Sequence, residues 1–131
     1  DCARRGVAAQ FIDWVASPAE LAEHYRRAKV VVCASTCEGG PRFTVEAMAC
    51  GTPVVSTPVG VMSSLLADGT CGRLCGFDTE SLRMELSTLL NNDELRRSSG
   101  LAAVERAQQF EYAHVLRGYA DGLKRLAEES A

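Results

Sequence analysis

The sequence predicts an α/β protein in which helices cover a parallel sheet and an all-helical tail follows. Short valine-rich runs alternate with amphipathic segments of helical period as far as Gly76. Beyond that glycine, only helical patterns occur. The length of 131 residues is that of one domain. We therefore expect a single domain with an α/β core at residues 7–76 and a helical tail at residues 77–131.

The composition is that of a globular protein with no general affinity for nucleic acid. Hydrophobic residues make up 47% and charged residues 24%, and the formal net charge is -3. An acidic balance gives no overall attraction to a phosphate backbone. The longest apolar run, residues 30–34, is too short to span a bilayer, and the first residues lack the apolar core of a signal peptide. We expect no nucleic-acid partner, no membrane span in this chain and a cytoplasmic location.

The elements of the core begin with a strand predicted at residues 7–12. The capping box S-P-A-E at residues 17–20 then opens a helix that ends near Lys29. The unbroken β-branched run 30–34 predicts a parallel strand covered on both faces. A second helix is expected over residues 41–50, where Gly51 stops it.

The later elements are a third strand, a short helix, a fourth strand and the helices of the tail. The third strand is expected at residues 53–56, the short helix at 61–67 and the fourth strand at 72–75. The first helix of the tail is expected to begin at Asp78 or Thr79, the second to run over 94–109 after a cap at Asp93, and the third over 111–128. The last helix carries an apolar stripe at Tyr112, Val115, Tyr119, Leu123 and Leu126. Tight packing against a neighbour would explain Gly118 and Gly122 within it.

Six cysteines raise the possibility of a zinc or redox site, because two pairs share a C-x3-C spacing. The pair Cys71 and Cys75 lies on an extended segment, where residues four apart are about 13 Å from each other. That separation is too large for one zinc ion with bonds of about 2.3 Å. Buried, reduced thiols are the favoured interpretation.

The stretch C-E-G-G-P-R-F-T-V-E, residues 37–46, follows a predicted strand and therefore lies at the carboxyl end of the sheet, where such folds bind ligands. Two glycines let a ligand approach the backbone closely, and Pro41 presets the first helical turn. The N–H groups of Arg42, Phe43 and Thr44 are expected to be free at the start of the helix. Together with the helix dipole they favour an anion such as phosphate.

Two carboxylates, Glu38 and Glu46, flank this predicted anion site. Glu46 can equally form an ordinary surface pair with Arg42, four residues earlier, and Glu38 can be a solvated loop acid. As ligands, both acids are placed to accept hydrogen bonds from the hydroxyls of a ribose or a hexose. They are not expected to act as an acid/base pair, because no histidine or metal cluster that could activate water accompanies them.

The central stretch resembles the donor-site signature of the retaining GT-B glycosyltransferases. Its letters, residues 35–57, are S-T-C-E-G-G-P-R-F-T-V-E-A-M-A-C-G-T-P-V-V-S-T. The segments F-I-D-W-V at 11–15, Y-R-R-A at 25–28, A-D-G at 67–69 and G-R-L at 72–74 resemble the elements on either side. The resemblance is strong over residues 7–76, and it implies a three-layer, Rossmann-like parallel sheet that forms part of the GT-B C-terminal domain.

The resemblance also implies a role for each residue of the motif. Glu46 would hold the ribose hydroxyls of the nucleotide, and Glu38, the implied catalytic residue, would receive a hydroxyl of the donor sugar. The backbone of Gly39, Gly40, Pro41 and Arg42 would lie against the sugar and the diphosphate, with Thr44 near the phosphates or the ribose. The donor would be a nucleotide sugar such as a UDP- or GDP-sugar, with no cofactor and no bound metal.

The sequence departs from the family pattern in three places. Asp13 stands where the family commonly has glycine, and Val59 to Ser63 lacks a double glycine and a following acid. The arginine and lysine that neutralise the diphosphate in the family precede this region. If residues 7–12 are the third strand of the order 3-2-1-4-5-6, strands 1 and 2 are not in this chain.

We therefore expect the C-terminal portion of a longer enzyme, with a separate N-terminal domain for an unidentified acceptor. Association with a membrane surface would then be a property of the full-length protein. Alone, residues 1–131 would bind nucleotide weakly at most and would not transfer sugar. The last helix, which crosses to the first domain in the family, would leave Tyr112 and Tyr119 exposed.

Three other functions remain open from the sequence. A nucleotide-sugar epimerase or a phosphorylase would share the architecture but use different chemistry. A non-catalytic binding or interaction module would keep the loop without turnover. The cysteines could still form a metal or redox site.

Overall fold

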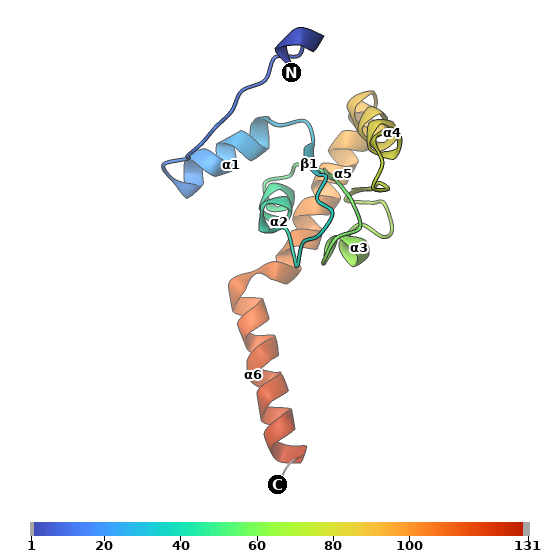
Figure 1. The fold of residues 1–131 in the computed structure, drawn as a ribbon. Coiled ribbons are helices and arrows are strands. Elements are labelled where there is room, and N and C mark those ends of the chain that lie inside the picture. The colour runs from blue at the N-terminus through green and yellow to red at the C-terminus, as the bar shows by residue number, and fades with distance from the viewer. Residues whose placement is uncertain (1, 130–131) are drawn as a thin grey trace.

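The computed structural model describes residues 2–129 (Figure 1). It contains a parallel sheet of three strands. The strands are β1 (Val31–Cys33), β2 (Val54–Ser56) and β3 (Gly72–Leu74), and they lie in the order β1-β2-β3. The register pairs Val31 with Val54, and Val54 with Gly72. The α/β class and the parallel sheet are as the sequence predicts.

Helix α1 (Pro18–Arg27) begins at the predicted capping box. The hydroxyl of Ser17 accepts a hydrogen bond of 3.2 Å from the N–H of Glu20, and the Glu20 carboxylate accepts one of 3.0 Å from the N–H of Ala16. The helix ends at Arg27, two residues before the predicted Lys29, because the chain is already extended at Ala28. This early end lets the chain turn directly into β1.

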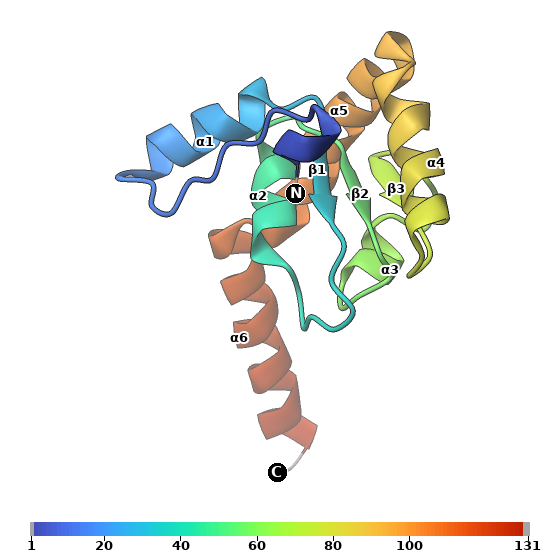
Figure 2. The same ribbon diagram turned by 45° about the horizontal axis from the view of Figure 1, so that its top comes forward.

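One face of the sheet is covered by helices α2 (Arg42–Ala49), α3 (Met62–Leu65) and α5 (Asp93–Ala107), with α1 packed on α2 (Figure 2). Buried side chains of these helices and of the segments around α3 form the larger core cluster with Cys33 and Val54: Ala47, Met48, Val59, Met62, Leu65, Leu66, Cys71, Ala103 and Ala107. Helix α5 comes very close to the turn after α2. A Cβ atom added to Gly100 would lie 2.4 Å from the Gly51 carbonyl oxygen, so only glycine fits there.

The opposite face is covered by α4 (Thr79–Leu90), which packs over β2. Val55, Cys75 and Leu89 form the smaller core cluster there, and this completes the three layers. All three residues of β2 are buried. The prediction that the first of these strands is covered on both faces is wrong, since Val32 of β1 is 37% exposed. The reason is its position: β1 is an edge strand of the described sheet, and α4 lies over its neighbour.

The strand predicted at residues 7–12 is also absent from the described structure. After the short 3-10 helix η1 (Ala3–Arg5), the chain runs irregularly to α1, and the side chains of Phe11 and Ile12 are 87% and 47% exposed. A strand needs a neighbour for its N–H and C=O groups. Within residues 2–129 no strand lies beside this segment, so its apolar residues alone do not make it a strand.

The tail consists of helices, as predicted, although some boundaries differ. Asp78 caps α4 by accepting from the N–H of Ser81, but Asn92, rather than Asp93, caps α5. The 3-10 helix η2 (Gln108–Phe110) separates α5 from α6 (Tyr112–Glu129).

Helix α6 projects away from the rest of the molecule (Figure 1). No residue of α6 is buried, and the side chains of Tyr112 and Tyr119 are 77% and 70% exposed, which confirms the exposure expected for them. A Cβ atom added to Gly118 or Gly122 would meet no atom within 4 Å, so the tight packing expected at these glycines is not present among residues 2–129. No helix in that range is long and apolar enough to cross a membrane.

The cysteines are free thiols. Cys33, Cys71 and Cys75 are buried, as the sequence predicts for core thiols, whereas Cys2 and Cys37 are exposed. Burial raises the pKa of the Cys71 and Cys75 thiols. Among residues 2–129 no three metal-ligating side chains come together.

Candidate functional site

The candidate site is built around the loop that leads from the carboxyl end of β1 to α2 (Figure 2). Glu38 and the two glycines after it are exposed on this loop. The Ser35 hydroxyl donates a hydrogen bond of 3.1 Å to the Glu38 carboxylate. A Cβ atom added to Gly39 would meet no atom within 4 Å, so this backbone is open to a ligand, as predicted.

The segment after β2 packs against this loop and forms hydrogen bonds with its first residues. The N–H of Thr57 donates to the Cys33 carbonyl at 3.0 Å, and its hydroxyl donates to the Ser35 carbonyl at 2.6 Å. Gly60 has a φ of +48°, and a Cβ atom there would lie 2.4 Å from the Gly39 carbonyl oxygen. The sequence marks Gly60 only as part of a departure from the family pattern, and its contact with the loop is a new finding.

The start of α2 offers fewer free amides than expected. Within residues 2–129, the N–H groups of Arg42 and Phe43 have no hydrogen-bond acceptor, but the N–H of Thr44 donates to the Pro41 carbonyl at 3.0 Å. The Thr44 side chain is fully buried, and its hydroxyl lies 2.5 Å from the same carbonyl and 3.2 Å from the Met62 sulfur. Thr44 therefore stabilises the first helical turn from inside. Its hydroxyl does not face the predicted anion site, because it lies on the core side of α2.

Glu46 lies one turn further along α2, and both of its carboxylate oxygens accept hydrogen bonds. Arg42 Nε donates to Oε1 at 2.8 Å, so the surface pair considered from the sequence is formed. The hydroxyl of Tyr25, on α1, donates to Oε2 at 3.1 Å. The Glu46 side chain is nevertheless 33% exposed. It is therefore neither sealed in the core nor freely solvated.

Glu46 borders an open groove of about 450 Å³ at the start of α2. The other lining residues are Gly40, Arg42, Val45, Val61 and Phe110. The structure thus brings Glu46 and the Gly40–Arg42 bend to one concave surface. Glu38 is not part of that lining and projects from the exposed loop before it.

Tyr25 is the residue of the site that sequence reasoning missed as a contact. Partial burial raises the pKa of its hydroxyl to about 12, and the hydrogen bond to Glu46 and the negative charge there act in the same direction. The hydroxyl therefore stays protonated, and remains a donor, throughout the physiological range. In the sequence, Tyr25 shares one helical face with the apolar residues Leu21 and Ala22, and this pattern gives no sign of the polar contact of its hydroxyl.

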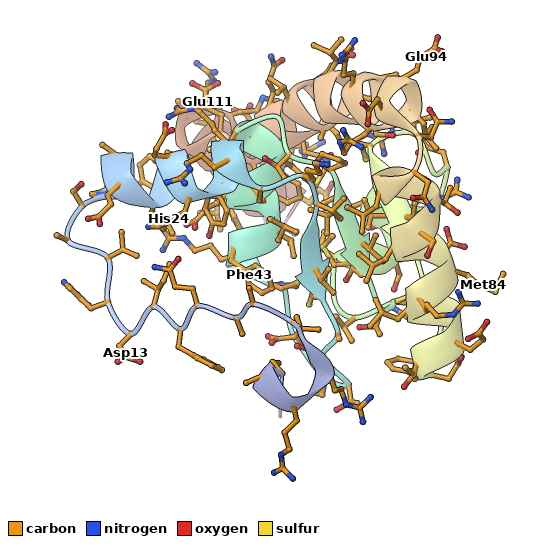
Figure 3. All side chains as sticks on the ribbon, turned by 90° about the horizontal axis from the view of Figure 1, so that it is seen from above. Asp13, His24, Phe43, Met84, Glu94 and Glu111 are labelled. Carbon is orange, nitrogen blue, oxygen red and sulfur yellow. The ribbon has the colours of Figure 1, made fainter. Side chains whose placement is uncertain are left out.

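Asp13, which stands where the family commonly has glycine, lies on the irregular segment before α1. It is exposed and stands away from the body of the protein (Figure 3). Among the described residues, this segment contributes nothing to the groove at Glu46.

The sequence matches the family model described as "Glycosyl transferases group 1" over residues 6–106. The chain belongs to this family. The D-inositol 3-phosphate glycosyltransferase of Segniliparus rotundus is 38% identical over 122 residues, which are 92% of this chain and 26% of the relative. The enzyme of the same name from Nocardia farcinica is 36% identical over 77% of this chain and 23% of its own length.

The fold is similar to a GT-B enzyme of known structure. The sucrose-phosphate synthase of Thermosynechococcus elongatus matches with a TM-score of 0.72 and 28% sequence identity, over 85% of this chain and 28% of that one. The GT-B architecture that the motif implies is therefore confirmed. The chain spans about a quarter of the length of each of these relatives.

Proposed function

We propose that this chain forms part of the donor site of a retaining glycosyltransferase, which moves a sugar from a nucleotide-sugar donor to an acceptor. One observation carries the proposal: the Glu46 carboxylate lies in the same open groove as the bend at Gly40–Arg42. A carboxylate suits sugar hydroxyls, and free amides at a helix start suit phosphate. Both belong in a site for a nucleoside diphosphate sugar.

In this proposal each residue of the motif has one task. Glu46 accepts hydrogen bonds from the ribose, and the N–H groups of Arg42 and Phe43 face the diphosphate together with the helix dipole. The backbone of Gly39, Gly40 and Pro41 lies against the sugar, and the Glu38 carboxylate accepts a hydrogen bond from one of the sugar's hydroxyls. Thr44 contributes indirectly, because its side chain fixes the turn that presents these amides.

The proposed chemistry breaks the bond between the anomeric carbon and the diphosphate. The acceptor hydroxyl attacks from the same face, so the anomeric configuration is retained, and its proton passes to the departing phosphate oxygen. Preorganised amides stabilise the charge that develops on that oxygen. The proposal assigns no step to a metal or a cofactor.

The proposed enzyme needs more than these residues. The rest of the donor site and an acceptor-binding domain would come from the remaining length of the full protein, so we propose that residues 1–131 alone do not transfer sugar. The acceptor is open. The names of the relatives make D-inositol 3-phosphate one compound to test.

Titration calorimetry with UDP, GDP and their glucose conjugates tests the proposal in the full-length protein. A hydrogen bond to a charged acceptor contributes about 1.5–3 kcal/mol, so Glu46→Ala is expected to weaken nucleotide binding about 10- to 100-fold. The control is Glu94→Ala, because Glu94 is exposed at the start of α5 (Figure 3) and does not line the groove at Glu46. Unchanged binding by Glu46→Ala would show that the donor site is not in this groove.

The same protein separates the competing functions. Binding without transfer to any acceptor would favour a non-catalytic module, and conversion of the donor in the absence of acceptor would favour an epimerase.

A further inference from the structure

The carboxylate of Glu46 is held by two donors of very different character. Arg42 lies on the same helix, and its side chain is 90% exposed. An exposed ion pair of this spacing contributes only about 0.3–0.5 kcal/mol and is readily exchanged for water or ligand. The bond from Arg42 to Oε1 is therefore replaceable.

Tyr25 holds the other oxygen from a fixed position. It is 21 residues away in sequence, on α1, and its ring packs against the larger core cluster while the hydroxyl reaches Glu46 Oε2. Its backbone is fixed as well, because the Thr52 hydroxyl donates to the Tyr25 carbonyl at 2.7 Å. Core packing and the hydrogen bond from Thr52 thus both fix Tyr25, and Tyr25 itself is not part of the groove lining.

We infer that Tyr25 is the positioning residue for ribose recognition: its hydroxyl orients the Glu46 carboxylate so that Oε1 exchanges Arg42 for a ribose hydroxyl. This inference rests on the proposed function and adds a residue outside the quoted motif. A phenol donor leaves the carboxylate charged and still able to accept, because each oxygen has more than one lone pair. A carboxylate already fixed in direction also loses less rotational freedom on binding.

A purely structural role for the same hydrogen bond makes a different prediction. If the bond only tied α1 to α2, its loss would affect every ligand equally. Recognition of the ribose instead requires that only the contribution of the 2′- and 3′-hydroxyls changes. The ratio of the Kd of a 2′,3′-dideoxynucleotide to that of the ribonucleotide separates the two roles.

The test compares UDP with 2′,3′-dideoxy-UDP, and GDP with 2′,3′-dideoxy-GDP, on the full-length protein. Tyr25→Phe keeps the ring and removes only the donor, and Tyr112→Phe is the matched control, since Tyr112 lies on α6 and does not line the groove at Glu46. We expect Tyr25→Phe to lower the ratio about threefold to tenfold through weaker ribonucleotide binding, with the Kd of the dideoxynucleotide unchanged. Tyr112→Phe should leave both constants unchanged.

The outcomes separate the inference from the proposed function. If Glu46→Ala abolishes the discrimination and Tyr25→Phe leaves it intact, Tyr25 has no positioning role and the donor site stands. If Tyr25→Phe weakens both nucleotides equally, the hydrogen bond is only structural and the inference is wrong. If Glu46→Ala leaves the discrimination intact, or if neither diphosphate binds, the donor site itself is wrong and the inference is overturned with it.

Discussion

At the scale of single residues, Gly60 shows how closely the segment after β2 packs against the loop of the candidate site. Its backbone is left-handed, and an added Cβ atom would lie 2.4 Å from the Gly39 carbonyl oxygen and 2.8 Å from that of Glu38. The contact is with backbone and not with a flexible side chain. An alanine at this position therefore has to displace the loop that carries Glu38.

We expect Gly60→Ala to destabilise the protein by about 1–3 kcal/mol and to weaken nucleotide binding. Denaturant unfolding measures the first effect and calorimetry measures the second. Gly118→Ala is the matched control: a Cβ atom there meets open space within a helix, so the change should be neutral or stabilising by up to about 1 kcal/mol. Equal stability of Gly60→Ala and the wild type would show that the loop adapts without cost.

Tyr25 gives a second prediction at this scale, at alkaline pH. Burial and the bond to Glu46 raise the pKa of Tyr25 from 10.0 to about 12, so between these values the unfolded chain has released a proton that the folded protein keeps. The free energy of unfolding therefore falls as the pH rises through this window. In Tyr25→Phe this contribution is absent, and urea denaturation at several pH values should show a shallower decline. Parallel declines would contradict the raised pKa.

Single residues also show which features of the site the sequence pattern can predict and which it cannot. The inward direction of Thr44 could have been predicted, since Thr44, Ala47 and Met48 are spaced i, i+3 and i+4 on the buried face of α2. The bond between Tyr25 and Glu46 could not, because it joins two helices whose packing is set by the fold. The spacing of residues within one helix says nothing about the distance between side chains of two different helices.

At the scale of elements, an ion pair links α5 to the loop after α3. Arg106 donates to the Asp68 carboxylate at 2.5 Å and to the Leu65 carbonyl at 3.0 Å, across 38 and 41 residues of sequence. The N–H of Thr70 and the Arg106 guanidinium hold the pKa of Asp68 well below its usual range. The charged carboxylate therefore stabilises the connection between the tail and the core.

We expect Asp68→Asn to lower the Tm at neutral pH. A lowered pKa contributes stability that is present above the ordinary value of 3.8 and is lost as the pH falls below it. The difference in Tm between the wild type and Asp68→Asn should therefore shrink on acidification below about pH 4. Thermal melts across this range are the measurement. A difference that stays constant with pH would assign the effect to packing rather than to charge.

The elements themselves were predictable where the local pattern and the tertiary surroundings agree. The capping box of α1, the buried β2 and the helices of the tail follow from short-range signals. The strand expected at residues 7–12 fails because pairing is a property of two segments, and only one is described. The prediction that β1 is covered on both faces is wrong for a related reason: the burial of a strand depends on where α4 packs, and α4 packs over β2.

At the scale of the whole molecule, α6 is set apart from everything else. It projects beyond the sheet and its helices (Figure 1). An open apolar groove of about 480 Å³ runs along its apolar stripe. Tyr119 and Leu123, both about two-thirds exposed, line it with Val115. The sequence predicts this stripe well, but the period of a helix says only that a face is apolar and not what lies on it.

The separation of α6 leads to a prediction about stability. Because α6 buries no residue, deleting residues 112–131 from the 131-residue chain should remove little of the free energy of folding. Surface substitutions usually change the free energy of unfolding by no more than about 0.5 kcal/mol, and a change of that size corresponds to a shift in Tm of about 2 °C for a domain of this length. Circular dichroism melts of the chain with and without α6 measure this shift. The truncated chain should also associate less with itself in sedimentation experiments, because an exposed apolar face is removed. A fall in Tm of more than about 8 °C would mean that α6 folds back onto the core, and that its apolar face belongs to this chain.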